Sequence, residues 1–195
     1  MRELFRMVFV LAVICGCSGL VLSYVNEATQ EQREYQLLKY VQEPSIKEVL
    51  REYEYTNDPI QDRMTMVVGE DKEGNPIEKT IFLAKKDGKV IAVSFSESAS
   101  GYGGDIDIMV GIDMQGNLAG ISVMTHSETP GLGARITQEA FRSQFRGIEL
   151  KDEFKLSTEG GDIDGISGAT FSSKGVVKAL NRAVQLFPRV KEEVS

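Results

Sequence analysis

Residues 105–123 read DIDIMVGIDMQGNLAGISV and alternate between apolar and polar or small positions. This period of two is typical of a strand with one face in a protein core. One face of the first strand carries Ile106, Ile108, Val110 and Ile112, and the other carries Asp105, Asp107 and Asp113. Gln115-Gly116-Asn117 then turns the chain into a second alternating strand with Ala119, Ile121 and Val123. The segment predicts an antiparallel pair whose aspartates form a solvated face and not a cation site.

The flanking sequence extends this sheet and adds helices. Further strands are predicted at Met64–Val68, Lys79–Lys85 and Val90–Ser96, the last two joined by the Asp87-Gly88 turn. Helical spacing of apolar residues appears first in Ile136, Ala140, Phe141 and Phe145, and later in Val176, Leu180, Ala183 and Phe187. The fold class is therefore α+β, with a mostly antiparallel sheet flanked by helices.

A long apolar segment begins near the N-terminus. Met7–Val25 has 19 residues without a charge, enough to cross most of a hydrocarbon core of about 30 Å. A cleaved signal peptide is the alternative, but its apolar region is usually only about 7–15 residues long. A lipoprotein anchored at Cys17 is a second alternative. Arg2 and Arg6 precede the segment, so we expect a cytoplasmic N-terminus and a domain on the other side of the membrane.

We expect the chain to divide into three parts. We expect residues 1–25 to form the N-terminus and transmembrane helix, residues 26–55 a helical stalk and linker, and residues 56–195 the extracytoplasmic domain, with Lys72 exposed on it. Pro44 is expected to end the stalk helix. Ser45 and Glu48 form a capping-box pattern for a second, short helix.

Composition excludes several classes of function. The net charge of -7 would repel a phosphate backbone, so nucleic acid is not an expected partner. Cys15, Cys17 and a single histidine supply neither a disulfide framework nor a zinc site, and we predict no metal. Neither a P-loop nor a Rossmann glycine motif is present. Ala169 replaces the second glycine of a nucleophile elbow, which argues against a serine hydrolase.

Glycine is concentrated in one part of the chain. Of 19 glycines, 14 fall between Gly101 and Gly175, mainly in three clusters: Gly101-Tyr102-Gly103-Gly104, Gly131-Leu132-Gly133, and Gly160 to Gly168. Such loops either line one pocket or serve only as turns.

Thr170 follows the last glycine cluster and precedes a helix that we expect to begin near Lys174, with Ser172 and Ser173 as N-caps. A helix N-terminus favours a phosphate, and Lys174 would add positive charge. The alternative is that Thr170 and the two serines are helix caps and nothing more.

Two motifs carry a family resemblance. Residues 164–170 read DGISGAT and resemble the flavinylation motif D-G-[IVL]-[ST]-G-A-T, and residues 126–133 read HSETPGLG and resemble the segment H-x-E-T-P-G-L-G that accompanies it. With the N-terminal apolar segment, the whole chain resembles the G subunits of the Rnf electron-transport complex. A related family is the C subunit of the sodium-translocating NADH:quinone oxidoreductase.

The resemblance implies a covalent flavin site. Thr170 would be esterified to the phosphate of FMN by a flavin transferase. Ser167, Gly168 and Ala169 would surround that phosphate, and Asp164 and Gly165 would complete the loop that the transferase recognises. The flavin pocket would include His126, Glu128, Thr129, Gly131, Leu132 and Gly133. A simpler interpretation makes His126 a hydrogen-bonded loop residue and Glu128 a brace for the loop backbone.

The resemblance also implies a role in electron transfer. The chain would be a single-pass protein of a prokaryotic cytoplasmic membrane that relays electrons through FMN in an ion-translocating ferredoxin:NAD oxidoreductase. Its partners would be the other membrane and redox subunits, the flavin transferase and membrane lipid, and it would not be active alone. Two alternatives stay open: an anchored FMN-domain reductase or sensor outside an ion pump, and an extracytoplasmic binding or structural domain without a cofactor.

Overall fold

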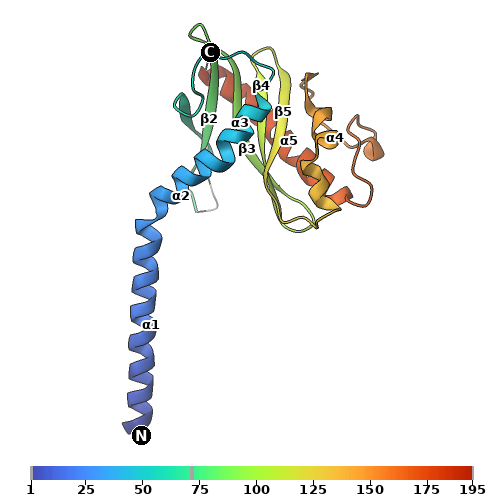
Figure 1. Cartoon of the computed structure of the whole chain (residues 1–195). Coiled ribbons are helices and arrows are strands. Elements are labelled where there is room, and N and C mark those ends of the chain that lie inside the picture. The colour runs from blue at the N-terminus through green and yellow to red at the C-terminus, as the bar shows by residue number, and fades with distance from the viewer. Residues whose placement is uncertain (1, 71–72, 195) are drawn as a thin grey trace. The chain divides into compact units, whose positions relative to one another are not determined.

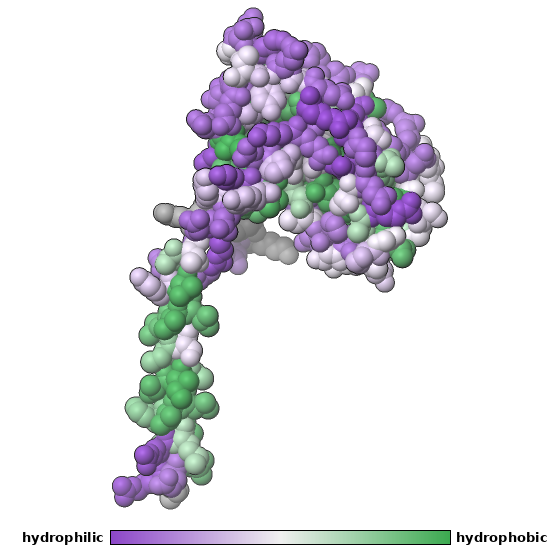
Figure 2. Space-filling model, viewed as in Figure 1, coloured by the Kyte–Doolittle hydropathy of each residue, from purple (hydrophilic) through white to green (hydrophobic). Residues whose placement is uncertain are grey.

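The computed structural model describes residues 2–70 and 73–194, so Lys72 lies outside the described residues. The chain divides after Tyr40 into two compact units. The first contains the helices α1 (Arg2–Ala28) and α2 (Gln30–Leu37), and a π-helical segment (Leu38–Gln42) begins at its end. None of the α1 residues is buried, and α1 is long and apolar enough to cross a membrane. Figure 2 shows its continuous hydrophobic surface between more polar ends.

The second unit is built on an antiparallel sheet in which each strand pairs with the next along the chain (Figure 1). The strands are β1 (Arg63–Glu70), β2 (Pro76–Lys86), β3 (Lys89–Ser100), β4 (Asp105–Asp113), β5 (Asn117–Thr125) and β6 (Ile148–Glu149). Asp87 and Gly88 both have positive φ, +52° and +77°, as a two-residue hairpin turn with right-handed strand twist requires. The predicted α+β class and the predicted strands are confirmed.

The C-terminal helix α5 (Thr170–Val194) covers one face of the sheet. Its predicted apolar positions are all buried: Val176, Leu180, Ala183 and Phe187. They pack against the alternating residues of β3 and β4 that the sequence places on one face, including Phe95, Ile106, Ile108 and Val110. The helix begins at Thr170 and not near Lys174, so Ser172 and Ser173 lie inside it and are not N-caps. Both serines are buried. Ser172 Oγ donates a hydrogen bond to Glu128, and Ser173 Oγ accepts one from the Ile166 N–H.

A short helix, α3 (Glu43–Val49), covers the opposite face at β4 and β5. Pro44 lies in its first turn, where the missing N–H costs nothing, so the expectation that Pro44 ends a helix is wrong. The expected capping box is not formed: Ser45 lies inside the helix, and the residue at the N-cap position, Gln42, makes no side-chain capping hydrogen bond. Glu48 instead accepts a hydrogen bond from Ser122 Oγ at 2.6 Å and pairs with Arg142, which ties α3 to the sheet and to the single-turn helix α4 (Glu139–Arg142).

The aspartates expected on the second face of β4 are not all solvated. Asp113 is buried and accepts hydrogen bonds from Tyr53 Oη and from the N–H and side chain of Asn117. Burial by itself would raise the pKa of Asp113, but these hydrogen bonds outweigh it and lower the pKa below its usual value. Burial and the Asp113 charge raise the pKa of Tyr53 to about 12. The interpretation of Asp113 as a solvated residue is therefore wrong.

The segment between β5 and α5 consists mainly of short helical turns. It contains 3-10 turns at Gly133–Thr137, Ser143–Phe145 and Ser157–Glu159, and the single-turn helix α4 (Glu139–Arg142). The apolar spacing from Ile136 to Phe145 thus lies on three successive turns, not on one continuous helix. The rings of Phe141 and Phe145 still meet edge to face with centroids 5.4 Å apart, and both are buried.

Candidate cofactor site

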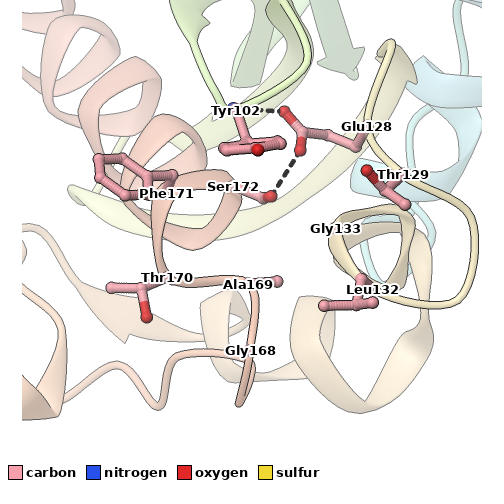
Figure 3. Close-up of a pocket in the computed structure, with 10 residues that line it drawn as sticks. All are labelled: Tyr102, Glu128, Thr129, Leu132, Gly133, Gly168, Ala169, Thr170, Phe171 and Ser172. Atoms are coloured by element: carbon pink, nitrogen blue, oxygen red, sulfur yellow. Dashed lines mark hydrogen bonds between the residues drawn. The ribbon is translucent and has the colours of Figure 1, made fainter.

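A pocket of about 320 Å³ lies at the N-terminal end of α5. Three segments meet there: the loop after β3, the loop after β5, and the first turn of α5 with the residues before it (Figure 3). The lining residues are Tyr102, Glu128, Thr129, Leu132, Gly133, Gly168, Ala169, Thr170, Phe171 and Ser172. Each of the three glycine clusters seen in the sequence contributes to this lining, so the interpretation that they line one pocket is confirmed.

Glu128 joins the three segments through its carboxylate. The residue is 5% exposed. Its Oε1 accepts hydrogen bonds from the N–H groups of Tyr102 at 2.7 Å and Gly103 at 3.1 Å, and its Oε2 accepts one from Ser172 Oγ at 2.6 Å. One buried carboxylate thus connects the first turn of α5 to the loop after β3 (Figure 3).

These contacts also determine the ionisation of Glu128. Burial disfavours a charged carboxylate and by itself would raise the pKa. The hydrogen bonds from Ser172, Gly103 and Tyr102, together with nearby His126, outweigh burial and lower the pKa of Glu128 below its usual value. Glu128 is therefore an anionic brace at neutral pH.

Glycine is required around this carboxylate because there is no room for a side chain. A Cβ atom on Gly133 would lie 2.5 Å from both Glu128 Oε2 and Ser172 Oγ. A Cβ atom on Gly101 would collide with Glu128 Oε1. Close approach to a fixed carboxylate therefore explains these two glycines.

Gly133→Ala is expected to destabilise the second unit by about 1–3 kcal/mol, because overpacking would push apart the Glu128–Ser172 hydrogen bond. Urea unfolding of the variant measures this loss. Gly69→Ala is the matched control, since a Cβ atom there meets nothing within 4 Å. Equal stability of the two variants would contradict the close packing around Glu128.

Thr170 is the first residue of α5 and is exposed at the pocket. Its hydroxyl makes no hydrogen bond with any described residue, and the N–H groups of Thr170, Phe171 and Ser172 donate none to the described part of the chain. Such free donors and the helix dipole favour an anion. Gly168, with φ of +79°, turns the chain into the helix in a conformation that other residues rarely adopt. The arrangement can bind an anionic group beside the Thr170 hydroxyl.

Five of the expected site residues lie outside the pocket lining: His126, Gly131, Asp164, Gly165 and Ser167. His126 Nδ1 accepts a hydrogen bond from the Glu128 N–H at 3.2 Å, which makes it a loop-bracing residue in this structure. The Asp164 backbone is held by Gln144, whose side chain bonds both its N–H and its C=O. Lys174 pairs with Glu159 at 2.7 Å and does not line the pocket, contrary to the expectation that it adds charge there.

Sequence reasoning did not assign Tyr102, Phe171 or Gln144 to the site. Tyr102 lies within the first glycine cluster and Phe171 directly follows Thr170, so both aromatic residues adjoin motifs that the sequence makes conspicuous.

Among the described residues, no group of three or more His, Cys, Asp and Glu side chains is arranged to hold a metal ion.

The part of the chain that forms this pocket matches a known domain class: the family model of the FMN-binding domain matches residues 101–185. The solved C subunit of the Na⁺-translocating NADH-quinone reductase from Parabacteroides distasonis is similar, with a TM-score of 0.52 and 25% identity. That similarity covers 70% of this chain and 81% of the solved one.

Similarity over nearly the full length defines the family more narrowly. The G subunit of the ion-translocating oxidoreductase complex from Vibrio cholerae is 33% identical over 90% of this chain and 86% of its own length. The G subunit from Methanosarcina acetivorans is 33% identical over 94% of both chains. The chain belongs to the family of G subunits of the ion-translocating oxidoreductase complex, and its resemblance to Rnf G subunits is confirmed.

Proposed function

We propose that this chain carries FMN as a phosphoester on Thr170 and relays electrons within an Rnf-type ion-translocating ferredoxin:NAD oxidoreductase. The observation that carries the proposal is the free Thr170 hydroxyl at a helix N-terminus, inside a pocket and beside three N–H groups without a partner among the described residues. Family membership supports the electron-transfer role.

The attachment reaction balances with FAD as donor and a flavin transferase as catalyst. The Thr170 oxygen bonds to the FMN phosphorus, the pyrophosphate bond of FAD breaks, AMP leaves, and the hydroxyl proton is lost. The N–H groups of the first α5 turn would then stabilise the phosphoester charge. The backbone segment that surrounds this phosphate would be Ser167, Gly168 and Ala169. The part of the loop that the transferase recognises would be Asp164 and Gly165.

The isoalloxazine ring supplies the redox chemistry, whereas the protein provides its position and its electrostatic surroundings. Glu128 fixes the loop after β3 against α5, and Thr129, Leu132 and Gly133 line the same pocket. His126 and Gly131 shape the loop that carries Glu128 and Leu132. The chain supplies one relay step and depends on the other subunits for the overall reaction.

Co-purification tests the role in a complex. Native membranes are solubilised in mild detergent, and an affinity-tagged copy of this chain is isolated. We expect integral membrane redox subunits in stoichiometric amounts, and ferredoxin:NAD oxidoreductase activity only in that assembly. A flavin-containing chain that purifies alone, with reductase activity of its own, would favour the alternative of a reductase outside an ion pump.

We place the part of α1 within residues 1–25 in a prokaryotic cytoplasmic membrane as a single-pass anchor, with residues 26–55 connecting it to an extracytoplasmic domain at 56–195. Its length and hydropathy suit a bilayer span. Arg2 and Arg6 precede the apolar stretch, which favours a cytoplasmic N-terminus. The flavin would then lie on the side opposite cytoplasmic NAD, and electrons would reach it through the other subunits of the complex.

Impermeant maleimide labelling of spheroplasts measures this orientation. In a background with Cys15→Ala and Cys17→Ala, a cysteine replacing exposed Gln115 is expected to react in intact spheroplasts. A cysteine replacing Glu3 is expected to react only after permeabilisation. The opposite labelling pattern would overturn the orientation.

A further inference from the structure

Large apolar side chains are rarely exposed in the described part of the second unit. Those that are exposed are Val67, Ile77, Tyr102, Leu132 and Phe171. Three of them line the pocket beside Thr170: Tyr102 is 74% exposed, Phe171 67% and Leu132 47%. Apolar surface gathered around one pocket is typical of a ligand-binding site.

The two aromatic rings lie next to each other although they come from different segments. Their centroids are 6.4 Å apart and their planes are inclined at 44°. Figure 3 shows both rings on the same side of the pocket, with Leu132 away from them near Gly168. A Cβ atom on Gly168 would lie 3.2 Å from Leu132 Cδ2, so Leu132 packs against the loop that leads to Thr170.

The backbone beneath both rings is fixed by Glu128. The Tyr102 N–H donates to one carboxylate oxygen, and Ser172, the residue after Phe171, donates to the other. Two exposed rings are thereby presented from anchored positions. Because the positions of the rings are fixed in advance, less conformational entropy is lost when a group binds to them.

We propose that Tyr102 and Phe171, together with Leu132, hold the isoalloxazine ring of the flavin attached to Thr170. This inference rests on the proposed function. Thr170 lines the same pocket and directly precedes Phe171, so a group bonded to its hydroxyl is delivered beside these apolar side chains. Contact with the isoalloxazine would remove their exposed surface from water and add aromatic stacking.

Time-resolved fluorescence anisotropy of the covalently attached flavin tests the proposal. A ring held by the pocket reorients with the whole domain, whereas a released ring also rotates about the single bonds of its tether on a faster timescale. Tyr102→Leu and Phe171→Leu are each expected to raise the ratio of released to held ring about fivefold. Tyr102→Phe is expected to behave like the wild type, because it keeps the aromatic ring.

Val67→Ala provides the matched control, since Val67 is also an exposed apolar residue but lies outside the pocket. Intact mass measures covalent loading separately, and the anisotropy reports only on loaded molecules. If the wild type and the leucine variants carry flavin and have the same anisotropy decay, the aromatic contact is wrong while the covalent attachment stands. If the wild type carries no covalent flavin, both proposals fail.

Another protein of the complex is the other conceivable occupant of this surface, and the same variants distinguish it. Unchanged anisotropy in Tyr102→Leu and Phe171→Leu, accompanied by loss of the assembled complex, would assign the rings to a protein interface and overturn our proposal. A faster anisotropy decay of these variants in the isolated chain supports the flavin contact, because no partner is present there.

Discussion

Thr170→Ala is expected to abolish covalent flavin. The substitution removes the oxygen that forms the phosphoester, while alanine keeps the first position of α5 in a helix. The protein would be produced together with its flavin transferase and separated on a denaturing gel. We expect in-gel flavin fluorescence from the wild type and only background from the variant.

Two further substitutions make this result specific. Thr170→Ser keeps a hydroxyl and is expected to retain partial loading, since only the methyl group that helps position the oxygen is lost. Thr129→Ala removes another hydroxyl from the same pocket and is expected to keep covalent flavin. Fluorescence of normal strength from Thr170→Ala would show that the flavin is attached elsewhere.

Glu128→Ala is expected to destabilise the second unit by about 3 kcal/mol or more, because it removes a charged acceptor from three donors and leaves two backbone N–H groups without it. Urea unfolding, followed by circular dichroism, measures the loss. Glu192→Ala removes an exposed carboxylate from α5 and is expected to change stability little. A loss no larger than that of Glu192→Ala would contradict the bracing role.

The pH dependence gives an independent test of the same carboxylate. Because the pKa of folded Glu128 is lowered, its contribution to stability is complete above the pKa of the unfolded chain. The contribution is lost as the pH falls through the folded pKa. The difference in stability between wild type and Glu128→Gln should therefore shrink on acidification.

The sheet and its α5 face follow from local pattern, whereas the second covered face does not. Alternation in residues 105–123 places Ile106 and Ile108 in the core, where the structure has them. The same alternation gives no sign that α3 packs on the other face, or that Asp113 is buried and bonded to Tyr53. The Tyr53–Asp113 hydrogen bond joins residues 60 positions apart, and such long-range packing overrides the local polarity of a strand.

The pocket was predictable where it depends on local motifs, but not where it depends on long-range contacts. Motif spacing directs attention to Thr170 and to the loop containing Glu128, and these residues lie in one pocket. The sequence does not show that Tyr102 reaches Phe171, because a tertiary contact across 69 positions brings the rings together. Nor does it reveal that Ser172 binds Glu128 and not the helix terminus, since a serine near a helix start has both options.

Peptide mapping of the protein from its native membrane tests the central claim most directly. Tryptic cleavage after Lys155 and Lys174 releases the peptide Leu156–Lys174, which contains Thr170 and other hydroxyl residues. We predict that this peptide carries the mass of one phosphoester-linked FMN, and that fragment ions assign it to Thr170. An unmodified peptide, or a flavin assigned to another residue, would contradict the account.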